Sequence, residues 1–223
     1  SRQDQDDFAI KSYSKALEAN KKNIFKKEIV PISLIDREGN KILIEKDEEP
    51  YKAKLENISR LKAAFTKEGT ITAANASKLN DGASVLLITN ELNAEKLGIK
   101  PLAKIKAHAS VAHEPEWFTS APGKAITKVL EKAKMSIEKI DLWEINEAFA
   151  AVTMAAMDDF EIPSENVNIY GGAVALGHPI GASGARILTT LLNGMENKKV
   201  KNGLATLCIG GGEASAIIIE RYD

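Results

Sequence analysis

The feature that most constrains this chain is a glycine-rich stretch, residues 171–186, which reads GGAVALGHPIGASGAR. Five glycines in sixteen positions let the backbone turn tightly and approach a ligand closely, because glycine has no side chain. His178 stands between Gly177 and Pro179 in this stretch. The pattern predicts a tight loop around a reactive imidazole. A lone histidine is more often structural, and we keep that interpretation for His108 and His113.

Two more segments accompany the glycine-rich stretch, namely NEAF at residues 146–149 and CIGGG at residues 208–212. In this order, the three segments resemble the thiolases, enzymes that make or break acetoacetyl-CoA and related thioesters. The first six residues, SRQDQD, resemble a segment from the middle of a thiolase. Thiolases use two cysteines, whereas this sequence contains one, Cys208. The resemblance therefore implies a C-terminal portion, with the nucleophilic cysteine in a missing N-terminal half.

The composition is that of an ordinary globular protein and excludes several classes of partner. Of the 223 residues, 44% are hydrophobic and 27% are charged, and the net charge is -1, which excludes a strongly basic nucleic-acid surface. No apolar run reaches the roughly 18 residues of a membrane span, so we expect no membrane partner either. A single cysteine forms no internal disulfide and fits a reducing compartment. We expect a mitochondrial or cytoplasmic location, with the mitochondrion favoured.

Local patterns predict the secondary structure of the first hundred residues. The predicted elements are an amphipathic helix over residues 1–20, a hairpin of 29–32 and 42–44, a charged loop over 46–54, a strand over 84–89, and a helix capped by Asn90 that ends near Gly98. The cap assignment follows from the preference of asparagine for helix N-termini.

From Pro101 onward, strand-like apolar runs alternate with helical patterns. The predicted strands are residues 105–111, 140–145, 167–170, 204–209 and 216–219, and the predicted helices begin at Pro122, around Phe149 and Val152, and at Ser183, the last one continuing to Leu192. Alternation of this kind predicts an α/β fold with a mostly parallel sheet covered on both faces. The last two strands are joined by a short glycine turn, so we expect them to be antiparallel.

The resemblance implies the thiolase fold, in which two similar halves pack as layers in the order α-β-α-β-α. It covers the whole chain, most closely after Asn75. In this interpretation residues 1–79 are the end of a loop domain, residues 80–100 are the last strand and helix of the N-terminal thiolase half, and residues 101–223 are the C-terminal thiolase domain.

The resemblance also assigns catalytic roles, each of which has a simpler structural alternative. It implies that His178 activates the nucleophilic cysteine and hydrogen-bonds the thioester oxygen, and that Cys208 is the acid/base that moves the α-proton. Asn146 holds a water that stabilises the enolate oxygen, and the backbone N–H of Gly210 belongs to an oxyanion hole. The alternatives are a structural histidine, a buried apolar cysteine and an N-cap asparagine. Glu147 either favours a helix N-terminus or orients its neighbours.

Binding residues for CoA and for an ion follow from the same resemblance. Taken alone, residues 75–82 indicate a plain turn and residues 46–54 a solvated charged loop. The resemblance implies that Ser77 contacts the pantetheine arm, that Lys52 and Lys54 meet the phosphates, and that Phe118 and Phe149 wall the acyl pocket, with Tyr13 near the cofactor. Potassium-activated members coordinate the ion, largely with backbone oxygens, at positions equivalent to Tyr13, Ala73, Ala74, Ala76 and Val174. Glu213 departs from the family pattern, where many members have another glycine.

The implied activity is that of an acetyl-CoA C-acetyltransferase of lipid metabolism, which condenses two acetyl-CoA into acetoacetyl-CoA and CoA. The isolated chain is expected to be inactive, because it lacks the nucleophilic cysteine. Dimers or tetramers are expected, with acyl-CoA substrate and the missing N-terminal half as partners. Two alternatives stay open: a long-chain 3-ketoacyl-CoA thiolase of β-oxidation, and a non-catalytic CoA-binding or scaffolding protein derived from a thiolase.

Overall fold

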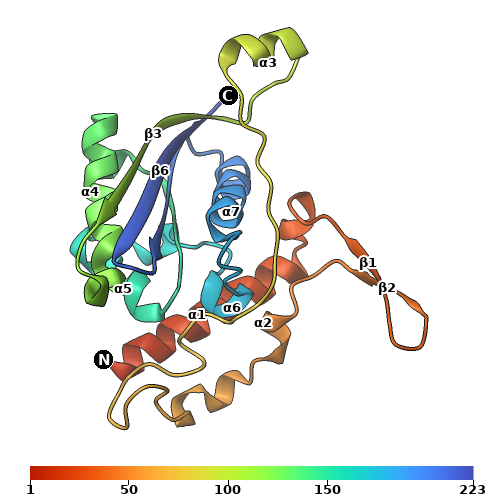
Figure 1. The fold of residues 1–223 in the computed structure, drawn as a ribbon, viewed down its shortest axis with the longest axis vertical. Coiled ribbons are helices and arrows are strands. Elements are labelled where there is room, and N and C mark those ends of the chain that lie inside the picture. The colour runs from red at the N-terminus through yellow and green to blue at the C-terminus, as the bar shows by residue number, and fades with distance from the viewer. Residues whose placement is uncertain (223) are drawn as a thin grey trace.

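A four-stranded sheet occupies the centre of the computed structural model, which describes residues 1–222 (Figure 1). Its strands lie in the order β3 (Ala103–Ala112), β6 (Glu213–Arg221), β5 (Asn202–Ile209) and β4 (Leu142–Ile145). Strand β6 pairs antiparallel with both β3 and β5, and only β4 and β5 are parallel. The prediction of antiparallel last strands is therefore confirmed. Strands β3, β4 and β5 run in the same direction, as a mostly parallel sheet requires, but β6 lies between β3 and β5, so β4 and β5 are the only neighbouring pair that is parallel in this sheet.

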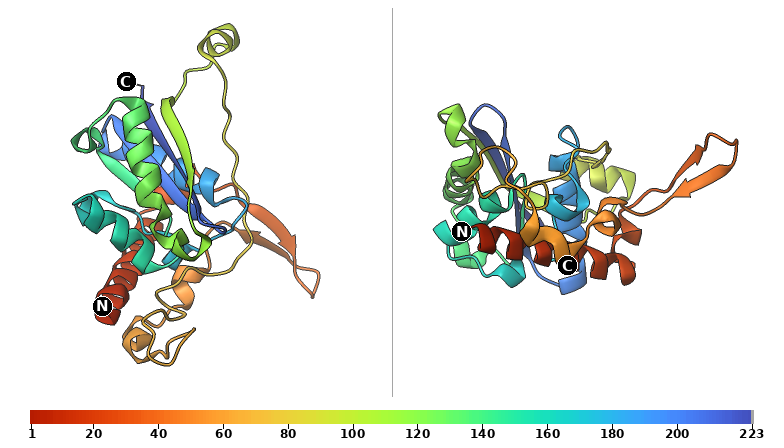
Figure 2. Two further views of the ribbon diagram at one scale, coloured as in Figure 1. Left: turned by 60° about the vertical axis from the view of Figure 1, so that its left-hand side comes forward. Right: turned by 90° about the horizontal axis from the view of Figure 1, so that it is seen from below.

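Helices cover both faces of this sheet, as expected for an α/β fold (Figures 1 and 2). Side chains alternate between faces along a strand, so neighbouring residues of one strand enter different cores. On one face, Leu204 and Ile218 pack with α4 (Ala121–Ala133) and α5 (Ala150–Asp159). On the other, Ala205 and Ile219 pack with α7 (Ser183–Lys198).

Helix α1 (Arg2–Lys21) confirms the first predicted helix and forms the floor of a second core. It begins with a capping box, in which the Ser1 hydroxyl accepts from the Asp4 backbone N–H while the Asp4 carboxylate accepts from the Ser1 amino group. Its buried face packs on the short helix α6 (Ala173–Leu176) in the glycine-rich stretch. The helix therefore holds one side of the loop that carries His178.

Among the remaining elements of the first hundred residues, a hairpin and a helix project from the body of the molecule (Figures 1 and 2). The hairpin of β1 (Ile32–Ile35) and β2 (Lys41–Ile44) extends away from the sheet (Figure 2), with its first strand three residues later than predicted. Within the predicted charged loop lies a short helix, α2 (Glu49–Lys52). Helix α3 (Glu91–Leu97) confirms its prediction, since Asn90 caps it and Gly98 ends it in the left-handed conformation. The 3-10 helices are Ile24–Lys27, Leu55–Arg60, Pro115–Ser120, Ile137–Lys139 and Ser164–Asn166.

Two predicted strands are absent from the described residues. Residues 84–89 run extended but unpaired (Figure 1), and Val85 is 89% exposed. A β-type apolar run becomes a strand only where a neighbouring strand completes its hydrogen bonds. Residues 167–170 reach the sheet through a single bridge, Trp143 with Val167, because Asn168 then turns with a positive φ of 44°.

Within residues 1–222, no helix combines the length and apolar character that crossing a lipid bilayer requires.

Gly171 offers a test of how α1 fixes the glycine-rich loop. Its φ is +81°, and a Cβ there would lie 2.6 Å from the Ser12 carbonyl oxygen. Gly171→Ala is expected to lower the free energy of unfolding by about 2–3 kcal/mol, because strain and steric overlap act together. Gly181→Ala, in the same loop with nothing within 4 Å, should change it by less than about 0.5 kcal/mol. Urea denaturation measures both, and equal losses would contradict this account.

Candidate active site

Asn146 and His178 meet where strand β4 ends. The Asn146 backbone N–H donates to the Thr206 carbonyl of β5 at 2.9 Å, which extends the parallel pairing by one residue. Its side-chain Nδ2 lies 3.4 Å from His178 Nε2. The N-cap alternative for Asn146 is wrong, since α5 begins at Ala150 and Phe149 holds the cap position. The amide is therefore free to contact the imidazole.

Hydrogen bonds around His178 define which ring nitrogen carries the proton. The Ser183 hydroxyl donates to the Pro179 carbonyl at 3.1 Å, and a hydroxyl has only one proton to donate. Its oxygen must then accept from His178 Nδ1, which lies 2.5 Å away. This network assigns the proton to Nδ1 and leaves Nε2 as the acceptor for Asn146. Ser183, the first residue of α7, is a site residue that sequence reasoning missed.

The protonation state of His178 follows from its surroundings. Burial lowers the pKa of the imidazole below its usual 6.5, and the nearby positive charge of Arg186 lowers it further. The ring is therefore neutral near pH 7. A neutral ring with an unprotonated Nε2 is competent to take a proton from a thiol or from a bound substrate.

Cys208 lies on β5, two residues beyond Thr206. Strand residues two apart point to the same face and are separated by about 7 Å. The Cys208 side chain therefore lies on the same face of β5 as Thr206, whose carbonyl pairs with Asn146. Its side chain is buried, and burial raises the pKa of the thiol. The turn after it contains Gly211 and Gly212, both with positive φ. The structure thus brings three predicted catalytic residues, Asn146, His178 and Cys208, to one end of β4 and β5.

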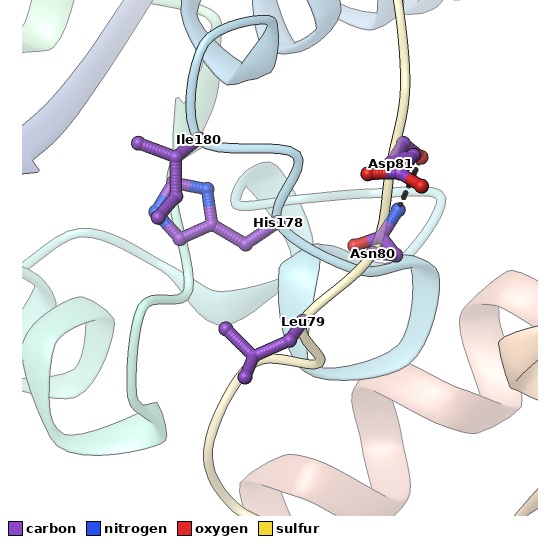
Figure 3. A pocket seen from close by; sticks show the side chains of 5 residues that line it. All are labelled: Leu79, Asn80, Asp81, His178 and Ile180. Carbon is purple, nitrogen blue, oxygen red and sulfur yellow. Dashed lines mark hydrogen bonds between the residues drawn. The ribbon is translucent and has the colours of Figure 1, made fainter.

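An open hollow of about 490 Å³ lies beside the imidazole (Figure 3). Its wall includes Leu79, Asn80 and Asp81, which come from the extended segment that runs alongside the histidine loop. The His178 backbone N–H donates to the Lys78 carbonyl at 3.0 Å and joins the two segments. Taken alone, the sequence predicted a plain turn here, and only the resemblance indicated a site, at Ser77.

Gly177 permits this close approach. A Cβ at residue 177 would lie 2.3 Å from Asn80 Oδ1, and the φ of Gly177 is +101°. Ile180 completes the wall of the hollow from the histidine loop itself. The glycine predicted to admit a ligand therefore admits a neighbouring chain segment instead.

Ser77 and Phe149 lie next to each other across a short backbone pairing. The Ser77 N–H donates to the Ala148 carbonyl at 3.0 Å, and Ala76 forms a β-bridge with Phe149. The Phe149 ring packs edge-on against Phe118 and against Phe65, with centroids 6.3 Å and 6.2 Å apart. The two predicted wall residues are thus in contact, and Phe65 is an additional aromatic neighbour that the sequence did not indicate.

Glu147 is a buried carboxylate that holds three segments together. Its oxygens accept from Ser12 Oγ at 2.7 Å, Asn168 Nδ2 at 2.8 Å and the Val174 N–H at 3.0 Å. Burial raises its pKa, and the three hydrogen bonds counter that rise. Of the two interpretations of Glu147, the structure favours orientation of its neighbours.

A second hollow, of about 340 Å³, gathers most of the other predicted binding residues. Lys52 and Lys54 line it, and the Lys52 ammonium is bonded to Glu49 at 2.7 Å. Three of the five predicted potassium ligands, Tyr13, Ala73 and Ala74, line the same hollow. Gly210 lies apart from both hollows, in the turn after β5.

The residues present do not fit a potassium ion. The Lys78 ammonium already donates to the carbonyl oxygens of Ala73, at 2.5 Å, and Ala76, at 3.1 Å. These oxygens are two of the predicted backbone ligands. The fifth predicted ligand, Val174, is fully buried in α6. In residues 1–222, no group of three His, Cys, Asp or Glu side chains is arranged to hold a metal.

Comparison with known families matches both halves of the chain. Residues 99–221 match the family model described as "Thiolase, C-terminal domain", and residues 1–92 match the one described as "Thiolase, N-terminal domain". The C-terminal match alone covers more than half of the chain. The chain therefore belongs to the thiolase family.

Sequence relatives agree with this assignment. A probable acetyl-CoA acetyltransferase of Dictyostelium discoideum is 47% identical over 220 residues, and a probable acetyl-CoA acyltransferase of Staphylococcus aureus is 46% identical over 223 residues. The matches cover 99% and 100% of this chain but 53% and 56% of the relatives. The chain thus spans about half the length of the curated relatives it matches.

Solved structures confirm the thiolase fold. The crystal structure of the Bacillus anthracis acetyl-CoA acetyltransferase matches with a TM-score of 0.96 and 40% sequence identity. A thiolase of Ascaris suum, solved in complex with coenzyme A, matches with a TM-score of 0.88 and 40% identity. Both matches cover 100% of this chain and 56% of the solved one.

The proton assignment of His178 is testable by ¹⁵N NMR of the imidazole. We expect Nδ1 to be protonated and Nε2 unprotonated at pH 7, with a titration midpoint below 6.5, because Ser183 accepts from Nδ1 and burial disfavours the cation. In Ser183→Ala the Nδ1 proton loses its acceptor, so the population protonated on Nε2 should rise. Ser110→Ala, which removes an exposed hydroxyl on β3, should leave the tautomer unchanged. A proton found on Nε2 in the unaltered chain would contradict the assignment.

Proposed function

We propose that the protein containing this chain is an acetyl-CoA C-acetyltransferase, which reversibly converts two acetyl-CoA into acetoacetyl-CoA and CoA. The observation that carries the proposal is the contact of His178 Nε2 with the Asn146 amide beside a hollow of about 490 Å³, with Cys208 at the same end of the sheet. The relatives named acetyl-CoA acetyltransferase, and the related structure that holds coenzyme A, support the choice of substrate.

The first half-reaction transfers an acetyl group to a cysteine outside this chain. His178 accepts the thiol proton on Nε2, and the resulting thiolate attacks the carbonyl carbon of acetyl-CoA. A bond forms between carbon and the cysteine sulfur, the bond to the CoA sulfur breaks, and the CoA thiolate takes the proton. The Gly210 N–H is proposed to donate to the oxyanion that forms meanwhile.

The second half-reaction forms the new carbon–carbon bond. Cys208, as a thiolate, removes an α-proton from a second acetyl-CoA, and Asn146 stabilises the enolate oxygen through the water it holds. The enolate carbon attacks the acetyl-cysteine, the carbon–sulfur bond breaks, and acetoacetyl-CoA leaves. The proton on Cys208 then passes to the released cysteine thiolate, which restores both sulfur groups to their starting states. Burial raises the pKa of the Cys208 thiol, so its thiolate is a stronger base toward the α-proton than an exposed thiolate would be. One buried polar atom, Asn146 Oδ1, has no protein partner among the described residues, which supports a substrate or water contact there.

The binding assignments complete the proposal. Ser77 contacts the pantetheine arm, Phe118 and Phe149 wall the acyl group, and Lys52 and Lys54 face the phosphates. The domain limits at residues 79 and 100, the assembly into dimers or tetramers, and the mitochondrial or cytoplasmic location are retained as proposals. The upstream half of the protein supplies the nucleophilic cysteine.

A second candidate is a 3-ketoacyl-CoA thiolase of β-oxidation. One observation favours it: the Staphylococcus aureus relatives are named acetyl-CoA acyltransferases, which does not restrict the acyl group to acetyl. Relative cleavage rates on acetoacetyl-CoA and on longer 3-ketoacyl-CoA separate the two candidates.

Residues 1–223 alone are expected to show no synthesis of acetoacetyl-CoA. The route uses two cysteines and this sequence contains one, so no residue is left to carry the acetyl group once Cys208 acts as acid/base. The absorbance of acetoacetyl-CoA measures the product, and a purified thiolase serves as the positive control. Turnover above background by the isolated chain would refute the assignment of a separate nucleophile.

In a complete thiolase that contains residues 1–223, the site residues should affect turnover unequally. His178→Ala should lower kcat/KM roughly a hundred- to ten-thousandfold, since it removes the general base. Asn146→Ala should lower kcat roughly a hundred- to a thousandfold, since it removes one donor to the enolate. His108→Ala, an exposed histidine on β3, is the matched control with unchanged rates. Equal, small effects of all three would favour the non-catalytic alternative.

A further inference from the structure

The turn that precedes Ser77 is held by its own side chains and by α1. Asn75 is fully buried; its Oδ1 accepts from the Thr72 N–H at 2.7 Å, and its Nδ2 donates to Asp6 of α1 at 2.9 Å. The Ala76 N–H donates to the Thr72 carbonyl at 3.1 Å. These contacts leave the carbonyls of Ala73 and Ala76 for another partner.

The Lys78 side chain turns back and supplies that partner. Its ammonium donates to Ala73 O at 2.5 Å and to Ala76 O at 3.1 Å, and it lies 5.6 Å from the centroid of the Tyr13 ring. Tyr13 is buried, so its ring face is fixed beside the charge. Two carbonyl oxygens and one aromatic face are groups that attract a cation. Burial lowers the pKa of Lys78, and the Glu49 carboxylate acts in the opposite direction.

The position of this ammonium excludes a separate ion on the same oxygens. A potassium ion would need the Ala73 and Ala76 carbonyls, both already engaged by Lys78. A second positive charge a few ångströms from the ammonium would be repelled, and more strongly in a half-buried hollow than in water. The Lys78 ammonium is covalently attached to the chain, whereas a bound ion exchanges with solvent. Order in the turn therefore does not depend on the concentration of an ion.

We propose that Lys78 is a built-in cation that orders the turn carrying Ser77, so that this protein works without the potassium ion its relationship would suggest. Lys78 is a positioning residue: it binds the carbonyls of Ala73 and Ala76, and through them acts on the Ser77 contact with Ala148 and the Ala76 bridge to Phe149. The proposal concerns how the turn is ordered and stands whether or not the enzyme condenses acetyl-CoA.

The test uses Lys78→Thr in the 223-residue chain, in potassium, sodium and choline chloride at equal ionic strength. For the unaltered chain we expect the same Tm and the same amide hydrogen exchange at residues 72–78 in all three salts. In Lys78→Thr, exchange at residues 72–78 should become about tenfold faster in choline. Potassium should restore the protection and raise the Tm by about 2–4 °C over choline, because the freed carbonyls now accept an ion.

Lys52→Thr is the matched control. It removes an ammonium that lines the same hollow but pairs with Glu48 and Glu49 instead of the turn. It should show no potassium response. Lys78→Arg, which keeps the charge, should keep the turn protected in choline and answers the question if Lys78→Thr does not fold. These readouts need no catalysis, so failure of the proposed function leaves them interpretable.

Three results would overturn the proposal. The first is a Tm of the unaltered chain that rises with potassium over choline. The second is unchanged hydrogen exchange at residues 72–78 in Lys78→Thr. If that variant does not fold, the equivalent result is that Lys78→Arg loses protection at residues 72–78 as completely as the unfolded variant does. The third is a loss of protection in Lys78→Thr that potassium does not restore better than sodium, which would make Lys78 an ordinary structural lysine.

Discussion

The buried carboxylate of Glu147 is the contact on which the site depends. It follows β4, accepts from Ser12 of α1, and accepts from the Val174 N–H of α6 in the glycine-rich loop. A buried carboxylate is costly unless its oxygens are hydrogen-bonded, so removal of any one donor is felt by the others. The loop that carries His178 is therefore held at a fixed distance from α1. A Cβ on Gly172 would lie 2.3 Å from the Glu147 carboxyl carbon, which explains a glycine there on steric grounds alone.

Much of this fold could be predicted from sequence because the evidence was local. The cap at Asn90 and the left-handed Gly98 define α3 within a few residues, and the spacing of apolar residues defines α1. The order of the strands in the sheet, with β6 between β3 and β5, could not be predicted in the same way, because it depends on which distant strand becomes the neighbour. Residues 84–89 have the composition of a strand, yet the described residues offer them no partner, and composition does not report a partner.

The site shows the same division between local and distant information. The glycine-rich loop indicated His178, and the strand-end glycines indicated Cys208. As an N-cap, Asn146 would be followed at once by the helix; α5 instead begins at Ala150, and this leaves the Asn146 amide free to contact the imidazole. Lys78 was not predicted to bind the carbonyls of Ala73 and Ala76, since a side chain that folds back over its own turn leaves no trace in residue spacing.

The parallel pairing of β4 with β5 decides whether the predicted catalytic residues can act together. Ile145 is paired with Thr206, and the Asn146 N–H continues that register to the Thr206 carbonyl. A slip of one residue would turn every β5 side chain to the opposite face of the sheet and would carry Cys208 into the core or away from the imidazole. Both faces of β5 are packed, by α4 on one side and α7 on the other, and such a strand strongly resists slippage. The two helices that cover the sheet therefore also place the thiol and the imidazole at the same strand end.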